Sequence, residues 1–149
     1  MLLRIKRMQK LVELADIELN KASQTLGALR EQYEKENAQL VSLVSYTKEY
    51  ANQPFNQAIV LTPIQLQTRY CFGDKLHQAI EAQKEQVNRL EEVAEKAREE
   101  WQEKKVRKES LLALLMKLKQ THQVELNKRE QRMLDELAAQ KVIASRGNK

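Results

Sequence analysis

The sequence contains few of the residues that interrupt helices or fill thick cores. It has three glycines, two prolines and seven aromatic residues in 149 positions. Globular domains place glycine and proline at their turns and bury large aromatic side chains, so this composition argues against a packed globule. Abundant Ala, Glu, Lys, Leu, Arg and Gln instead indicate long helices.

Disulfides and long apolar runs are also missing. The single cysteine, Cys71, cannot form an internal disulfide, which favours a reducing compartment. The longest apolar run, Leu111 to Met116, is far shorter than the ~20 residues that span a bilayer. Charged residues occur among the first seven positions, where a secretory signal would require an apolar core. We therefore expect a cytoplasmic protein.

Two stripes of apolar residues at helical spacing dominate the chain. Positions three or four apart return to one side of a helix, and a spacing kept over several heptads is typical of a coiled-coil seam. In the first stripe, eleven of thirteen positions are apolar or aromatic. They are Met8, Val12, Ala15, Leu19, Ala22, Leu26, Leu29, Tyr33, Glu36, Leu40, Leu43, Thr47 and Tyr50.

The second stripe has only one polar member among eight. It consists of Leu76, Ile80, Gln83, Val87, Leu90, Ala94, Ala97 and Trp101. Because both stripes follow the coiled-coil spacing, the sequence predicts an all-α fold. We expect a long two-helix antiparallel coiled coil with an extended C-terminal helix.

The helix boundaries follow from the local sequence. We expect one helical hairpin over residues 1–149, with a helix over about 3–51, a hinge over 52–62, a helix over about 63–142 and a frayed tail over 143–149. Pro54 ends the first helix because it lacks a backbone donor. Thr62, Pro63 and Gln65 form a capping box with proline at the first helical position.

A short link predicts the register of the two helices. If pairing starts beside the link, Tyr50 lies opposite Pro63 and Leu76 lies near Asn37. Paired residue numbers then add up to about 113, and the first helix ends opposite about Lys108. More than thirty residues of the second helix would have no internal partner.

The expected overhang is rich in leucine. Since exposing a leucine costs ~1.5–3 kcal/mol, we expect residues 110–140 to bury this surface in a partner or a second copy. The alternative is that the second helix bends back, or that the first helix starts in a different register and covers it.

Basic residues cluster at both sides of the expected open end. Arg4, Lys6, Arg7 and Lys10 begin the first helix, and Lys104, Lys105, Arg107 and Lys108 lie opposite them in the expected register. This collar suits an acidic surface on a partner, although solvated charges are the more common case. Nucleic acid is a weaker third interpretation, because no aromatic residues or binding module accompany the charges.

No set of residues predicts catalysis, a cofactor or a metal. His77 and His122 are too far apart on one helix to share an ion, and we expect them at the surface or the seam edge. We interpret Cys71 as a packed thiol. Acidic pairs such as Glu91 and Glu92 lie on a helix surface without a pocket that would raise their pKa. We expect a protein that is not an enzyme.

More specific motifs flank the hinge. Q-x3-L-x2-Y-x3-Y precedes it and F-x3-L-x2-A-x3-Q follows it, with Trp101 before Lys104 and Lys105, and a late Q-R-M-L-D-E at 131–136. In order, spacing and length the chain resembles the flagellar export protein FliJ family. The resemblance implies a coiled coil like the central stalk of rotary ATPases. It also implies insertion of the paired helix ends into the ring of the flagellar export ATPase, with promotion of ring assembly and activity.

The resemblance implies further partners and their residues. Family members bind the cytoplasmic region of the export-gate membrane protein, at the cytoplasmic face of the inner membrane, and recycle export chaperones. On this sequence the gate residues would be Gln39, Leu43, Tyr46, Tyr50, Phe72, Leu76, Ala79 and Gln83. The ring residues would be Arg4, Arg7, Lys104, Lys105, Arg107, Lys108, Leu111, Leu115 and Leu118.

Two alternatives remain open. The injectisome counterpart of this stalk shares the architecture, and a homo-oligomeric coiled-coil scaffold would have the same seams. Within the gate set, Leu43, Tyr50 and Leu76 also fall on the seams, where their ordinary role is packing. Tyr46 lies off the seam and is the better candidate for a surface contact.

Overall fold

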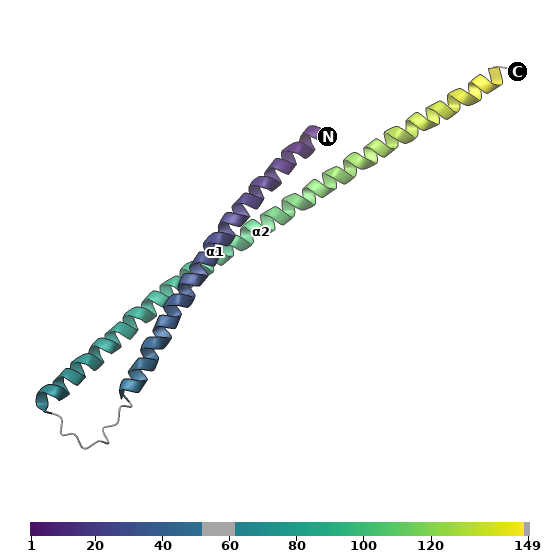
Figure 1. Cartoon of the computed structure of the whole chain (residues 1–149). Coiled ribbons are helices and arrows are strands. Elements are labelled where there is room, and N and C mark those ends of the chain that lie inside the picture. Colours follow the sequence, from purple (N-terminus) through teal and green to yellow (C-terminus); the bar gives the residue numbers. More distant parts are fainter. Residues whose placement is uncertain (52–61, 148–149) are drawn as a thin grey trace. The chain divides into compact units, whose positions relative to one another are not determined.

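Two long helices make up the part of the chain that the structure describes. In the computed structural model the described residues are 1–51 and 62–147, and they contain no strand. Helix α1 is Leu2–Ala51 and helix α2 is Pro63–Gly147 (Figure 1). The fold is therefore all-α, as predicted. The expected break at Asn52–Pro54 lies outside the described residues.

The start of α2 has the predicted cap. The Thr62 backbone N–H donates to Gln65 Oε1 at 3.1 Å, and the Gln65 N–H donates to Thr62 Oγ1 at 3.3 Å. This reciprocal pair satisfies two donors that the first turn of a helix leaves without partners. At the other end, α2 continues to Gly147, five residues past the expected end of the helix near residue 142.

The chain divides into two compact units, which are described separately. Unit 1 contains Met1–Asn20 and Glu103–Lys149, and unit 2 contains Lys21–Gln102. In unit 2, Tyr50 contacts Phe72 and Glu36 contacts Gln83, so α1 and α2 are antiparallel there. In unit 1, Asp16 contacts Lys108 and Glu18 contacts Lys104, which again is an antiparallel pairing.

Both predicted seams are confirmed by burial. All thirteen positions of the first stripe and all eight of the second are buried or half-buried. The core of unit 2 is made by Leu26, Leu76, Ile80, Val87, Leu90 and Ala97, and that of unit 1 by Ile5, Ala15 and Leu115. Among the described residues no large side chain is completely enclosed, as expected when only two helices share a core.

The second seam also extends further than the sequence suggested. The same spacing of three and four residues continues through Lys104, Lys108, Leu111, Leu115, Leu118 and His122, all of which are buried or half-buried. Two lysines therefore occupy seam positions in unit 1, where the sequence pattern had suggested the end of the stripe.

The expected register is wrong by about one heptad. Paired residue numbers add up to 119 for Glu36 and Gln83 and to 122 for Tyr50 and Phe72, not to about 113. Pairing does not start beside the link, because Tyr50 contacts Arg69 and Phe72 and does not lie opposite Pro63. Leu76, four residues after Phe72, consequently lies opposite about Tyr46 and not near Asn37.

The register in unit 1 shortens the expected overhang. Asp16 and Lys108 give a sum of 124, so α1 does not end opposite Lys108 but extends past it. Its first residues, Met1–Leu3, instead line a shallow hollow together with residues between His122 and Arg129. The part of α2 beyond α1 is therefore about 130–147, not a stretch of more than thirty residues.

Candidate partner-binding surfaces

The eight predicted gate residues all lie in one stretch of unit 2. They fall between two cross-helix contacts, the Tyr50–Phe72 ring pair at 5.0 Å and the Gln83–Glu36 hydrogen bonds. The register expected from the sequence would have displaced the predicted gate residues of α1 along the pair from those of α2. The observed register places the two groups opposite each other. The structure thus brings together residues that lie up to 44 positions apart in the chain.

Four of the eight residues are seam residues. Leu43, Tyr50 and Gln83 are half-buried between the helices, and Leu76 is only 9% exposed. The Tyr50 and Phe72 rings meet edge to face, with an interplanar angle of 64°, and the Arg69 guanidinium carbon lies 5.5 Å from the Tyr50 ring centre. These contacts join α1 to α2, so packing accounts for the four seam residues.

The other four residues form an exposed surface, which we call the flank cluster: Gln39, Tyr46, Phe72 and Ala79. Gln39, Tyr46 and Ala79 stand one position before a seam residue of their own helix, and Phe72 stands before Gly73, which is half-buried and three residues before Leu76. In an antiparallel pair the positions that precede the seam lie on the same flank of both helices. Tyr46 is 50% exposed and Phe72 39%, so two aromatic rings are presented on this flank.

Apolar side chains at the start of α2 lie next to the flank cluster and were not predicted from sequence. Ile64 and Tyr70 are 77% and 74% exposed, because the first turns of α2 precede its pairing with α1. A shallow hollow of about 420 Å³ joins Ile64 to Tyr50 and Phe72. The available sequence signal was that Ile64, Leu66 and Tyr70 precede the second stripe, which begins at Leu76.

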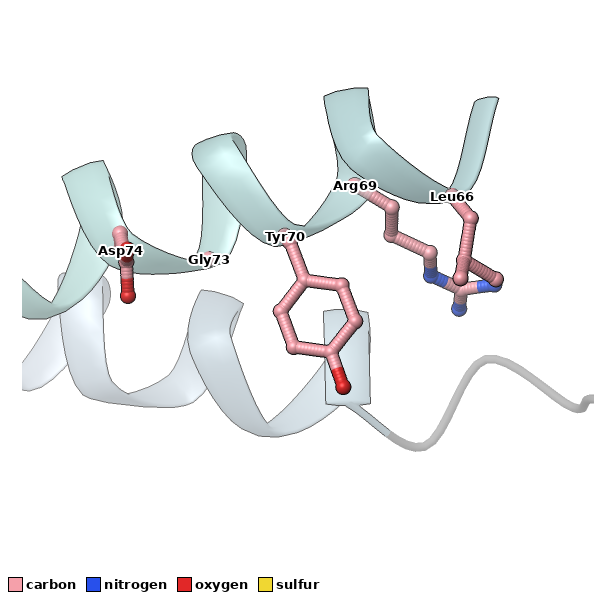
Figure 2. Close-up of a pocket in the computed structure, with 5 residues that line it drawn as sticks. All are labelled: Leu66, Arg69, Tyr70, Gly73 and Asp74. Atoms are coloured by element: carbon pink, nitrogen blue, oxygen red, sulfur yellow. The ribbon is translucent and has the colours of Figure 1, made fainter. Parts of the chain in front are cut away.

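A second hollow lies on the same turns of α2. It has a volume of about 370 Å³ and is lined by Leu66, Arg69, Tyr70, Gly73 and Asp74. Figure 2 shows the side chains of Arg69, Tyr70 and Asp74 pointing from α2 toward the side on which α1 runs. Cys71, on these same turns, is exposed, so the predicted packed thiol is wrong.

The predicted ring residues divide into two groups in unit 1. Leu111 and Leu118 are half-buried in the seam and Leu115 is 7% exposed, so α1 already covers all three. This is the alternative in which the first helix starts in a different register. The expectation that a partner covers these three leucines is wrong for the chain as described.

The basic collar is likewise divided. Lys104 Nζ lies 3.3 Å from Glu18 Oε2, and Lys108 Nζ lies 2.6 Å from Asp16 Oδ1. These two lysines face acids, not the basic residues at the start of α1, because the register differs from the expected one. The side chains of Arg4, Arg7, Lys105 and Arg107 are exposed.

Exposed apolar side chains in unit 1 lie near the start of α1 and along α2 from Val106 to Ile143. The hollow of about 470 Å³ beside Met1–Leu3 is lined from α2 by His122, Glu125, Leu126 and Arg129. Beyond it, α2 exposes Met133, Leu134, Leu137, Val142 and Ile143. This surface overlaps the one predicted over residues 110–140, within which Leu112, Leu114 and Met116 are also exposed.

The two units differ in charge. Unit 1 contains 16 Lys and Arg against nine Asp and Glu, whereas unit 2 contains ten against twelve. The whole positive excess of the chain therefore lies in unit 1, where it accompanies the exposed apolar residues. A cationic surface with apolar side chains suits an acidic protein partner.

Among the described residues, Glu95 and Arg98 form an ion pair on α2. The Arg98 guanidinium donates to both carboxylate oxygens of Glu95, and this hydrogen bond on an exposed helix face lowers the pKa of Glu95 and raises that of Arg98. His77 is exposed and His122 is half-buried in the seam. Within residues 1–51 and 62–147, no group of three His, Cys, Asp or Glu side chains could hold a metal ion.

Neither described helix is apolar enough to cross a membrane.

Comparison with known proteins identifies the family. The model of the family described as Flagellar FliJ protein matches residues 5–147, which is nearly the whole chain. No curated protein and no solved structure matches. The family is a non-enzymatic component of flagellar protein export. With two antiparallel helices, continuous seams and a family match across both units, this chain belongs to the flagellar FliJ family.

Proposed function

We propose that this protein is a stalk and coupling factor of the flagellar export apparatus, with unit 1 bound in the ring of the export ATPase. The observation that carries the proposal is the joint location of positive charge and exposed apolar side chains in unit 1. Long-range attraction steers such a surface to an acidic site, and burial of its apolar residues then stabilises the complex. Binding there promotes ring assembly and ATP hydrolysis.

The ring contact involves only part of the set of residues suggested by sequence, together with further residues of α2. Arg4, Arg7, Lys105 and Arg107 supply exposed charge, and the apolar residues of 130–147 supply contact area. Leu111, Leu115 and Leu118 act indirectly, because they hold α1 against α2. Lys104 and Lys108 do the same through their ion pairs with α1.

The flank cluster in unit 2 binds the cytoplasmic region of the export-gate membrane protein. Gln39, Tyr46, Phe72 and Ala79 supply an exposed surface with two aromatic rings, and aromatic side chains are frequent anchors of protein interfaces. Such binding places the protein at the cytoplasmic face of the inner membrane at the flagellar base. Export chaperones are a further class of partner, which this protein recycles during export.

ATP turnover by the cognate export ATPase tests the ring contact. We compare the full chain with a variant truncated after Arg129, which removes the part of α2 beyond α1 and leaves the seam intact. We expect stimulation by the full chain and most of it to be lost on truncation. Tyr46→Ala, which changes unit 2 only, serves as the matched control and should stimulate fully.

The same experiment separates the stalk from a self-associating scaffold. The scaffold predicts a stable dimer of the free chain that dissociates on truncation after Arg129, with no effect of either protein on ATP turnover. Sedimentation of both proteins at several concentrations measures the oligomeric state. Equal ATP turnover with and without the full chain contradicts the ring proposal.

A further inference from the structure

The only polar residue of the second stripe and one of the two polar residues of the first contact each other. Gln83 Nε2 donates to the backbone oxygen of Glu36 at 2.8 Å and to Glu36 Oε2 at 2.7 Å. Both residues are half-buried at the seam. The other polar residue of the first stripe, Thr47, donates to the Leu43 carbonyl of its own helix at 2.8 Å and needs no partner on α2.

Leucine occupies the positions one heptad away on both helices. If α1 slides by one heptad in one direction, Glu36 faces Leu90 and Gln83 faces Leu43. In the other direction, Glu36 faces Leu76 and Gln83 faces Leu29. Either slide leaves a carboxylate and an amide against leucine side chains, where their hydrogen-bonding groups lose a partner.

The apolar residues of the seam discriminate less between these registers. A slide of one heptad moves each seam residue to an equivalent position of the next heptad, and nearly all seam positions of both stripes are apolar, so apolar residues again lie opposite apolar residues. The chain between the helices does not prevent the slide either. Eleven residues separate Ala51 from Pro63 and reach roughly 36 Å when extended, whereas one heptad is roughly 10 Å of helix.

We propose that the Glu36–Gln83 pair fixes the register of α1 against α2 in unit 2, and that Gln83 is a positioning residue and not a contact of the gate. A single polar position inside a coiled-coil seam specifies register at a cost in stability. Here the register it specifies places Gln39 and Tyr46 opposite Ala79 and Phe72. A slide of one heptad breaks both of these pairs and leaves a single cross-helix pair in the flank cluster, Tyr46 opposite Ala79 in one direction or Gln39 opposite Phe72 in the other.

The test measures register directly by the distance between two spin labels. With Cys71→Ser as background, labels are attached at Ser45→Cys on α1 and Glu92→Cys on α2, both exposed sites of unit 2. These sites are offset along the helices, so a slide by one heptad shifts the measured distance by several ångströms. We expect one narrow distance distribution for the otherwise unchanged chain.

Replacing both polar residues by leucine, as Glu36→Leu with Gln83→Leu, should add a second distance while helicity is retained. The exchanged variant, Glu36→Gln with Gln83→Glu, keeps a hydrogen-bonding pair and should restore the single distance. Ser42→Leu with Gln86→Leu adds two leucines at exposed positions and is the matched control. A single unshifted distance in the seam double-leucine variant overturns the proposal, as does an equally broad distribution in the exchanged variant.

The consequence for partner binding rests on the proposed function and is tested by a separate binding measurement. We expect the seam double-leucine variant to bind the export-gate cytoplasmic region several-fold more weakly, in proportion to the population with the second distance. A second distance without any loss of gate binding supports the register role and contradicts the proposed gate surface. An unchanged distance with weaker gate binding assigns Gln83 to the gate contact and overturns the positioning role.

Discussion

Lys108 Nζ lies 2.6 Å from Asp16 Oδ1, so a lysine at a seam position of α2 is paired with an acid of α1. Lys104 is placed in the same way against Glu18. Both lysine side chains are about 30% exposed, at 29% and 31%, because their aliphatic parts lie along the seam. Of the four cations that follow Trp101, Lys104 and Lys108 are therefore paired with acids of α1, whereas Lys105 and Arg107 are exposed.

Charge reversal at the seam lysines should loosen the pairing of unit 1. Lys104→Glu with Lys108→Glu places two acids against Asp16 and Glu18, and like charges at partly shielded positions repel. We expect amide hydrogen exchange over residues 2–20 to become roughly tenfold faster, which corresponds to about 1.4 kcal/mol. Adding Asp16→Lys and Glu18→Lys restores opposite charges and should restore protection; unchanged exchange in the first variant contradicts the role of these pairs.

Charge reversal at the exposed cations should instead affect the ATPase. Arg7→Glu with Arg107→Glu changes exposed side chains outside the seam, so helicity and exchange over residues 2–20 should stay as they are. We expect weaker binding to the export ATPase, with a larger loss at low salt, because ionic screening reduces the steering of exposed charges. The measurement is binding affinity at two salt concentrations, and equal affinities of variant and parent remove these cations from the interface.

Replacing a leucine of the seam by alanine should have a different consequence from replacing a leucine in the part of α2 beyond α1. Leu115 is 7% exposed between the helices, so Leu115→Ala should lower the free energy of unfolding by about 2 kcal/mol, the lower end of the range for core leucines. Leu137 is 53% exposed, so Leu137→Ala should leave stability within ~0.5 kcal/mol and reduce stimulation of the ATPase. Urea unfolding and ATP turnover measure the two effects, and equal destabilisation by both variants would mean that 130–147 is packed.

The flank cluster predicts a binding defect without a folding defect. Tyr46 is half exposed, so Tyr46→Ala should keep helicity and stability nearly unchanged while it weakens binding to the export-gate cytoplasmic region. The matched control is Val41→Ala, which removes an exposed apolar side chain of α1 outside the cluster. A loss of about tenfold in affinity for the first variant only is the expected result, and comparable affinities for both would count against the cluster.

Gly27 offers a stabilising substitution. It lies inside α1, and a Cβ atom added there meets nothing within 4 Å. Gly27→Ala should therefore raise the free energy of unfolding by roughly 0.5–1 kcal/mol, because alanine loses less backbone entropy in a helix than glycine does. The change appears as a higher midpoint in urea unfolding; a lower midpoint would show that the site is more crowded than the described side chains indicate.

Much of the fold could be read from single residues and their spacing. The stripes from Met8 to Tyr50 and from Leu76 to Trp101 marked the seams because a helix returns its residues to one side every 3.5 positions in a coiled coil. Thr62 and Gln65 marked the start of α2 because a capping box is a local arrangement. The motifs around the hinge also indicated the family that the full-length match then showed.

The register could not be read in that way, and the candidate surfaces depend on it. Local spacing says which side of a helix is buried but not which turn faces which. The expected register, close to a sum of 113, places Glu36 near Leu76, whereas the structure brings Glu36 to Gln83. The same difference moved Leu111, Leu115 and Leu118 under α1 and paired Lys104 and Lys108 with acids.

The sequence by itself therefore determined the two helices, their buried sides and the cap at the start of α2, since each of these depends on residues within a few turns. Only the tertiary structure decided which turns of α1 and α2 lie opposite each other in the set of predicted gate residues. It also decided which cations and leucines remain exposed. The reason is physical. Apolar seams fit in several registers with similar burial, and a few polar contacts between residues about 47 to 92 positions apart distinguish one register from the rest.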